Sequence, residues 1–137
     1  PEKENGLSFV PGKMGQAVRI TRNANSVLEY ALKGNVIPER GTIAFWFKPE
    51  WKDRGYSANG QEIWRSLFAF PIPEQRIGSG ALRLWWWGSR LRADQSDDED
   101  SYVTYTTKVN NEWQHIAFAW DETGSILYIN GKPAKFI

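Results

Sequence analysis

Tryptophan and arginine alternate with aliphatic residues over residues 81–94, and this alternation carries the clearest chemical signal in the chain. If the segment folds as two strands joined by a turn, one face carries two indole rings among charged groups. The residues of that face are Arg83, Trp85, Trp87, Arg90, Arg92 and Asp94. Indole rings stack on sugar rings, and guanidinium and carboxylate groups hydrogen-bond their hydroxyls. The pattern predicts a glycan-binding surface, and its arginines favour an anionic or sulfated glycan.

The turn between the two strands must place these side chains on one face. Gly88-Ser89 suits a two-residue type II′ turn, whose twist matches that of the strands it joins. Such a turn sets Trp87 opposite Arg90, Trp86 opposite Leu91, Trp85 opposite Arg92, and Arg83 opposite Asp94. The second face then carries Leu82, Leu84, Trp86, Leu91 and Ala93. Because these residues are apolar, we expect this second face to point into the core.

A purely structural interpretation of the same residues stays open. Tryptophan and arginine on a hairpin stabilise each other by cross-strand packing and cation–π contact without any ligand. These residue types are also enriched in protein interfaces, so the face could pack against a neighbouring domain or a protein partner. The sequence therefore supports a glycan-binding module and, as its alternative, a structural or adhesion module.

Composition limits the classes of protein to consider. The 137 residues suit one domain over residues 1–137. A net charge of +1 gives no electrostatic basis for binding nucleic acid or an anionic membrane. No apolar run reaches the length of a membrane span, so we expect no membrane insertion. The absence of cysteine excludes disulfides, thiolate metal sites and cysteine nucleophiles.

Short β-rich runs bounded by turn residues recur along the chain, whereas helical periodicity is nearly absent. The predicted strands are residues 16–21, 27–31, 42–48, 66–70, 81–87, 90–93, 102–107, 113–120, 125–130 and 132–137. Segments 50–61 and 71–76 read as long surface loops. Segments 43–47 and 116–120 are apolar on both faces, so we expect central strands covered on both sides. The pattern predicts an all-β antiparallel jelly-roll β-sandwich.

Several segments resemble the laminin G-like domains of the concanavalin A-like lectin/glucanase superfamily. The segments are FVPGKMGQAV at 9–18, GTIAFWFKP at 41–49, WQHIA at 113–117, WD at 120–121 and LYINGK at 127–132. The resemblance implies a sandwich of two curved antiparallel sheets. The same segments resemble the bacterial versions of this domain, which are appended to large secreted or cell-surface proteins, often beside carbohydrate-active enzymes. It also implies a location that is extracellular, at the cell surface or periplasmic.

The resemblance assigns structural roles to its shared residues. It implies that Trp46, Trp113 and Trp120 fill the core and that Asn130-Gly131 forms a tight turn with positive φ angles. In the family the chain continues past this turn with further strands. We therefore expect residues 1–137 to be a piece of a longer protein, with other domains of the same polypeptide as partners. Either the last strands are missing from this chain, or another segment supplies them.

Catalysis is not the function that the sequence favours. His115 is the single histidine, and its place within a strand favours a structural role over a catalytic triad. Glycoside hydrolysis needs two carboxylates in a cleft, and the strand motif of alternating acids that hydrolases of this fold carry is absent. We expect no enzyme activity in this chain, although its parent protein could be a carbohydrate-active enzyme. A third interpretation is a truncated hydrolase or lyase whose acids lie beyond Ile137.

The acidic segment 94–100 is the candidate cation site. Asp97, Asp98 and Asp100 could bind calcium, which prefers several carboxylate and carbonyl oxygens. The segment lacks the spacing and glycine of an EF-hand, and the sequence favours a solvated acidic loop over a calcium site. A calcium ion here would lie beside Arg92 and Asp94 and could order the tryptophan face.

Calcium gives the first test. If segment 94–100 binds the ion, added calcium raises the melting temperature, because a ligand of the folded state stabilises that state by mass action. Thermal unfolding of the chain with and without calcium measures the effect. An unchanged melting temperature removes the calcium site from the account.

Overall fold

A computed structural model describes most of the chain. The described residues are 3–5, 7–21, 26–37, 39–51, 57–61, 63–71, 81–88, 90–94, 102–106 and 111–134. They form two compact units, Pro1–Ile37 and Pro38–Ile137, and each is described by itself. The assignment of residues 1–137 to one domain stays a prediction.

The first unit consists of two short antiparallel pairs. Strand β1 (Lys3–Asn5) pairs with β4 (Val27–Glu29), and β2 (Leu7–Pro11) pairs with β3 (Gln16–Ile20). Gly15, with φ of 61°, closes the turn between β2 and β3, where the Gly12 N–H donates to its carbonyl at 2.9 Å. The predictions for β3 and β4 are confirmed within two residues. The sequence did not predict β1 and β2.

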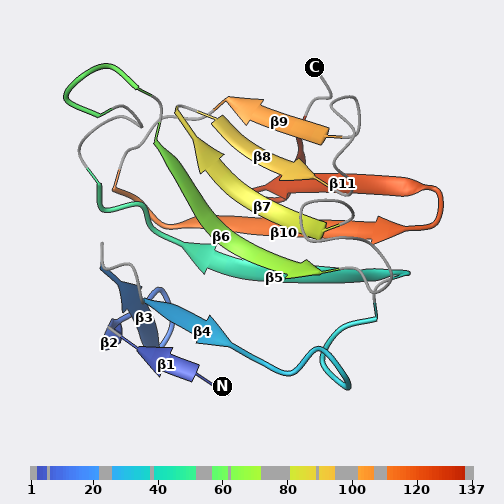
Figure 1. Ribbon diagram of the computed structural model, residues 1–137, viewed down its shortest axis with the longest axis horizontal. Helices are drawn as coiled ribbons and strands as arrows, with labels where there is room; N and C mark the ends of the chain where they lie inside the picture. The colour runs from blue at the N-terminus through green and yellow to red at the C-terminus, as the bar shows by residue number, and fades with distance from the viewer. Residues whose placement is uncertain are drawn as a thin grey trace. The chain divides into compact units, whose positions relative to one another are not determined.

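The second unit holds two four-stranded antiparallel sheets (Figure 1). One sheet has the order β12-β11-β10-β5, from β5 (Gly41–Phe47), β10 (Gln114–Asp121), β11 (Gly124–Ile129) and β12 (Lys132–Pro133). The other has the order β6-β7-β8-β9, from β6 (Trp64–Pro71), β7 (Ala81–Trp87), β8 (Arg90–Asp94) and β9 (Tyr102–Thr106). The described residues contain no helix, which confirms the all-β antiparallel class. Among them, therefore, no helix is long and apolar enough to cross a membrane.

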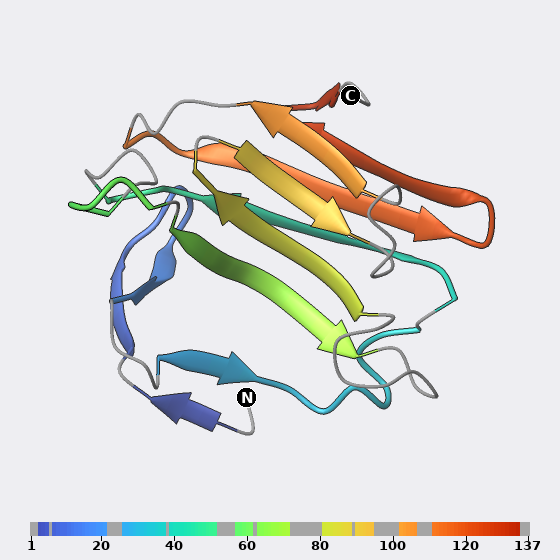
Figure 2. The ribbon, with the colours of Figure 1, turned by 45° about the horizontal axis from the view of Figure 1, so that its top comes forward.

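The core lies between these two sheets, which face one another in Figure 2. Strand β10 alternates buried and half-buried residues with the two-residue period of a strand, and its buried side chains include Ile116, Phe118 and Trp120. Rings from opposite sheets meet at two places. The Phe70 and Trp120 centroids are 5.7 Å apart, and those of Phe47 and Trp86 are 6.0 Å apart. Buried aromatic rings thus hold the layers together.

Trp51 extends this core beyond the end of β5. Its ring centroid lies 5.6 Å from that of Phe47 and 5.4 Å from that of Trp86, so it contacts side chains of both sheets. The predicted surface loop 50–61 therefore begins with a core anchor. The free energy gained by burying an indole between two sheets exceeds the conformational entropy that the residue loses when it is ordered.

Strand β5 corrects two expectations. It lies at one end of the described four-stranded sheet, whereas β10, which contains the other segment predicted to be central, has a strand on each side. Its outward residues Thr42, Ala44 and Trp46 are exposed, and Trp46 is 39% accessible instead of filling the core. The outward face looked apolar in the sequence because it carries Ala44 beside Trp46, and a small alanine side chain loses little free energy when it is exposed to water. Trp113 is half-buried, and Trp120 is the one of the three tryptophans that is fully in the core.

The Asn130-Gly131 turn is confirmed. Both residues have positive φ, 51° and 77°, as a type I′ turn requires. The turn is tied back to β10 by two hydrogen bonds of 2.8 Å. The His115 N–H donates to the Asn130 side-chain Oδ1, and the Asn130 N–H donates to the His115 carbonyl. This clamp fixes the β10–β11 register at one end.

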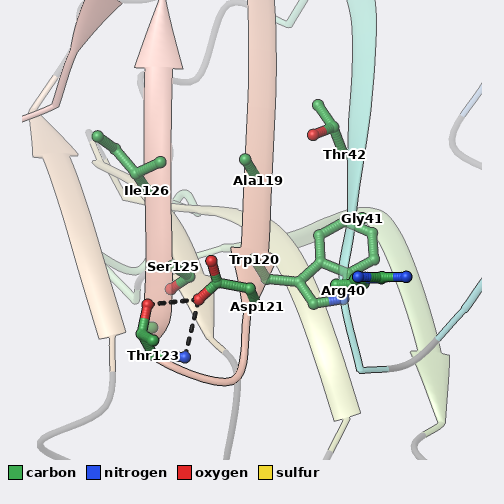
Figure 3. A pocket seen from close by; sticks show the side chains of 10 residues that line it. Arg40, Gly41, Thr42, Ala119, Trp120, Asp121, Thr123, Ser125 and Ile126 are labelled. Carbon is green, nitrogen blue, oxygen red and sulfur yellow. Dashed lines mark hydrogen bonds between the residues drawn. The ribbon is translucent and has the colours of Figure 1, made fainter.

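Gly41 gives a direct test of the core. It lies opposite Trp120 in the β5–β10 pair (Figure 3), and a Cβ atom there would come within 2.7 Å of the Trp120 Cζ2 atom. We predict that Gly41→Ala lowers the free energy of unfolding by about 1–3 kcal/mol, since the indole has to move out of its packed position. Denaturant unfolding measures the change.

Thr42→Val is the matched control, because Thr42 is the exposed neighbour of Gly41 in the same strand. We expect a change within about 0.5 kcal/mol for this variant. Wild-type stability of Gly41→Ala would contradict the packing of Trp120 described above.

Candidate functional site

The β7–β8 hairpin adopts the predicted register. Trp87 pairs with Arg90, Trp86 with Leu91, Trp85 with Arg92, and Arg83 with Asp94. Gly88 has φ of 56°, the left-handed value that either primed turn needs at its first central position. Ser89 lies outside the described residues.

The inward face of the hairpin is buried as expected. Leu82, Leu84, Trp86, Leu91 and Ala93 are each at most 1% exposed. The Trp86 indole N–H donates to the Gly88 carbonyl at 2.9 Å, so the polar atom of this core side chain is satisfied by the turn. With Trp86 locked inward, the two-residue period of the strand turns Trp85 and Trp87 outward.

Strand β6 adds a third tryptophan to the outward face. It pairs with β7 so that Trp64 lies opposite Trp87 and Ser66 lies opposite Trp85. Trp64 is 48% exposed, whereas Trp85 and Trp87 are half-buried. We define the tryptophan–arginine face as the outward side chains Trp64, Trp85, Trp87, Arg83, Arg90 and Arg92.

The three rings of this face form one cluster. The Trp64 and Trp87 rings stack with centroids 4.8 Å apart and an interplanar angle of 25°. The Trp64 and Trp85 centroids are also 4.8 Å apart, at 63°, which is an edge-to-face contact. Both arrangements are favoured by the ring quadrupole. Trp64 therefore lies against both of the tryptophans predicted to bind glycan.

Guanidinium groups cover two of the rings. The Arg83 Cζ lies 4.8 Å from the Trp85 centroid, and the Arg90 Cζ lies 5.6 Å from that of Trp87. Cation–π contacts of this kind contribute about 0.5–1 kcal/mol at exposed sites. The Arg90–Trp87 contact is the cross-strand packing that the structural interpretation expects, whereas Arg83 and Trp85 lie two residues apart on β7. Both contacts leave Trp64 as the most open ring of the cluster.

The charged side chains of the face that the structure describes are cationic. Among its outward positions with described side chains, the charged groups are Arg83, Arg90 and Arg92. Asp94 occupies the register position opposite Arg83. Strand β9 continues the row of pairs, with Thr106 opposite Arg90 and Thr104 opposite Arg92.

The Trp87 indole nitrogen is a buried polar atom of this face. It meets no hydrogen-bond acceptor among the described residues. An unpaired buried donor costs free energy. The Trp86 indole one residue earlier, in contrast, is fully satisfied.

Sequence reasoning missed Trp64. The strand was predicted to begin at Ser66, two residues later, and a bulge between Ser66 and Phe68 breaks the alternation that would have shown the direction of the side chains. The available signal was the spacing itself, because Trp64 and Ser66 are two residues apart and so share a face.

The predicted metal ligands Asp97, Asp98 and Asp100 lie outside the described residues, as do the remaining residues of 95–101. Within the described part of the chain, no group of three or more histidine, cysteine, aspartate or glutamate side chains could hold a metal ion. The calcium site stays a prediction.

His115 has a structural environment. Its ring makes an edge contact with Trp46 at 5.2 Å, and both its backbone polar groups bond to Asn130. The residue lies on the outward side of β10, remote in sequence and register from the tryptophan–arginine face. This placement agrees with the expectation of a structural histidine.

An open depression lies at the far end of the β10–β11 hairpin (Figure 3). Its lining includes Arg40, Trp120, Asp121, Thr123 and Ile126. The Thr123 hydroxyl donates to the Asp121 Oδ1 at 2.6 Å, and the Thr123 N–H donates to the same oxygen at 2.8 Å. These bonds, with one from the Gly124 N–H, lower the pKa of Asp121 below its ordinary value of 3.8. The carboxylate therefore stabilises the turn that joins β10 to β11.

Comparison with protein families identifies the fold. A family model described as the Concanavalin A-like lectin/glucanases superfamily, of the laminin G type, matches residues 30–135. The chain belongs to this family. The match begins at Tyr30, so the resemblance of residues 9–18 to the family stays a prediction. No match was found among curated proteins or among solved structures.

Asp121 predicts a pH dependence. Because the carboxylate has a lowered pKa in the folded state, its contribution to stability is present above the unfolded pKa and is lost as pH falls through the folded value. Asp121→Asn should lower the melting temperature near neutral pH, and the gap from wild type should close as the pH falls through the lowered pKa of the folded state. Thermal unfolding across pH measures it.

Glu122→Gln is the control, since this exposed acid lies in the same turn. We expect no gap that depends on pH for this variant. A difference between Asp121→Asn and wild type that stays constant down to acid pH would show that the turn does not depend on the ionised carboxylate.

Proposed function

We propose that this domain is a non-catalytic carbohydrate-binding module that holds glycans on the tryptophan–arginine face. The observation that carries the proposal is the cluster of three indole rings on that face, with Trp64 48% exposed. Open indole surface beside guanidinium groups supplies the stacking and the hydrogen bonding that sugar recognition needs. Membership of a superfamily named for lectins and glucanases agrees with a carbohydrate ligand.

Binding without cleavage is the better use of these residues. Glycoside hydrolysis needs two carboxylates flanking the scissile bond, whereas the described charges of the face are arginines. The open depression at the hairpin end has one carboxylate among its lining residues, Asp121, and its oxygen already accepts two bonds from Thr123. These arrangements support a module that binds a glycan.

The module would act within a larger secreted or cell-surface bacterial protein. There it would hold that protein, which could itself be a carbohydrate-active enzyme, on its polysaccharide. Its setting would be extracellular, at the cell surface or periplasmic. Calcium at Asp97, Asp98 and Asp100 would lie just beyond the end of β8 and would order that end of the face.

A structural or adhesion module is the second candidate, and the packing of the rings favours it. Trp85 and Trp87 already contact Trp64 and lie beneath Arg83 and Arg90, so much of the cluster is satisfied without a ligand. The remaining surface would then pack on a neighbouring domain or protein. Sedimentation of the chain over a range of concentrations separates the candidates, because a pure interface role predicts self-association or poor solubility.

A glycan array tests the proposed function. We predict that the wild-type chain binds at least one class of glycan, and that Trp85→Ala weakens binding about tenfold or more while remaining folded, since Trp85 supports the ring cluster. Parallel screens with and without calcium report the role of the ion. Silence of the wild type on all glycans, or full binding by a folded Trp85→Ala, would contradict the proposal.

A further inference from the structure

We propose that the domain has a second glycan site, on the outward face of the sheet formed by β5, β10, β11 and β12. The site takes an extended neutral glycan and uses no residue of the tryptophan–arginine face, so it goes beyond the proposed function. It combines the open depression at the β10–β11 turn with the surface next to it. We call that surface the alanine surface and define it by Ala44, Trp46, Ala117, Ala119, Ile126 and Tyr128.

The strand register places these side chains together. In β10, and in β11 over residues 126–129, buried and half-buried residues alternate, so the half-buried ones point away from the core. Ala117 pairs with Ala44 on one side and with Tyr128 on the other, and Ala119 pairs with Ile126. These residues all lie in the second compact unit. The outward side chains of three neighbouring strands therefore form one surface.

Side-chain size gives this surface a low centre between larger groups. Its three alanines contribute only methyl groups. At one end Trp46 is 39% exposed, and its ring centroid lies 5.2 Å from that of His115, the residue with which it pairs. Ile126 and Tyr128 are the larger side chains along β11. A flat apolar centre beside an exposed indole suits the C–H face of a sugar ring.

The open depression lies at the other end of the same surface. Ala119 and Ile126 belong to both, and Figure 3 shows them with Thr42 on three neighbouring strands. The eight residues of β10 lead from beside Trp46 to this depression and span roughly 23 Å at about 3.3 Å per residue. A short oligosaccharide therefore has room to lie along β10, with one end at the indole and the other in the depression.

Charge distinguishes this site from the tryptophan–arginine face. The charged residues that line the depression are Arg40 and Asp121, and their charges have opposite signs. The described charges of the other face, in contrast, are all arginines. A neutral glycan matches the depression, because its hydroxyls can hydrogen-bond to a guanidinium or to the Thr42 hydroxyl and bring no net charge that must be balanced.

Calorimetric titration of the full chain tests the inference. The probes are four neutral hexasaccharides: cellohexaose, laminarihexaose, xylohexaose and mannohexaose. We expect at least one of them to bind. Trp46→Ala should weaken that binding about tenfold or more, and Trp46→Phe should restore most of it, since a phenyl ring also stacks on a sugar. Added salt should change the affinity little, because no net charge is neutralised.

A second variant tests the alanine surface itself. Ala117→Gln places a longer side chain at its centre and should also weaken binding about tenfold or more, while the outward position leaves the core intact. Trp64→Ala is the matched control, because Trp64 is an exposed tryptophan of the other face. We expect it to bind the neutral probes as wild type does. Melting temperatures show that each variant is folded.

The outcomes separate this inference from the proposed function. Absence of binding to every neutral probe, or wild-type binding by folded Trp46→Ala and Ala117→Gln, overturns the inference, and the array with Trp85→Ala still decides the proposed function. Loss of binding in Trp64→Ala alone places the glycan on the tryptophan–arginine face, which overturns the inference and supports the proposed function. Loss in Trp46→Ala, with every array glycan bound normally by Trp85→Ala, supports the inference and overturns the proposed function's site.

Discussion

The inward burial of Trp86 is the constraint on which the rest of this structure depends. Its ring contacts Phe47 of the facing sheet and the loop residue Trp51, and its N–H bonds to the Gly88 carbonyl. Removing a buried indole costs about 3–5 kcal/mol, a large part of the roughly 5–15 kcal/mol that stabilises a domain. If β7 shifted by one residue, Trp86 would be exposed and Arg83 would be buried. The observed register of β7 is therefore strongly favoured over the shifted one.

The outward face follows from that constraint. Once Leu82, Leu84 and Trp86 point inward, Trp85 and Trp87 must point outward, where Trp64 and two arginines pack on them. This packing stabilises the hairpin, and it also holds the rings in place before any ligand arrives. A preorganised surface loses little conformational entropy on binding. The structural and the ligand-binding interpretations of these residues are therefore compatible.

The hairpin was predictable because turn chemistry and alternation agree locally. Gly88-Ser89 set the β7–β8 register, and Asn130-Gly131 set that of β11 and β12. The predictions were wrong or incomplete where the local sequence pattern does not determine the structure. The bulge after Ser66 obscured the direction of Trp64, and no local pattern after Pro49 indicated the core role of Trp51. Ala44 and Trp46 made the outward face of β5 look covered, although Trp46 is exposed. Which sheet edge lacks a neighbour depends on pairing between distant strands, and a local pattern does not determine it.

A titration followed through the indole N–H signals tests the central claim most directly. The chain has eight tryptophans, and a ¹H–¹⁵N spectrum gives each indole its own signal. With an acidic oligosaccharide that the chain binds, we predict changes at Trp64, Trp85 and Trp87, while buried Trp86 and Trp120 and the distant Trp46 stay unchanged. Changes centred on Trp46 or Trp113, with the cluster unaffected, would place the binding surface elsewhere and contradict the account.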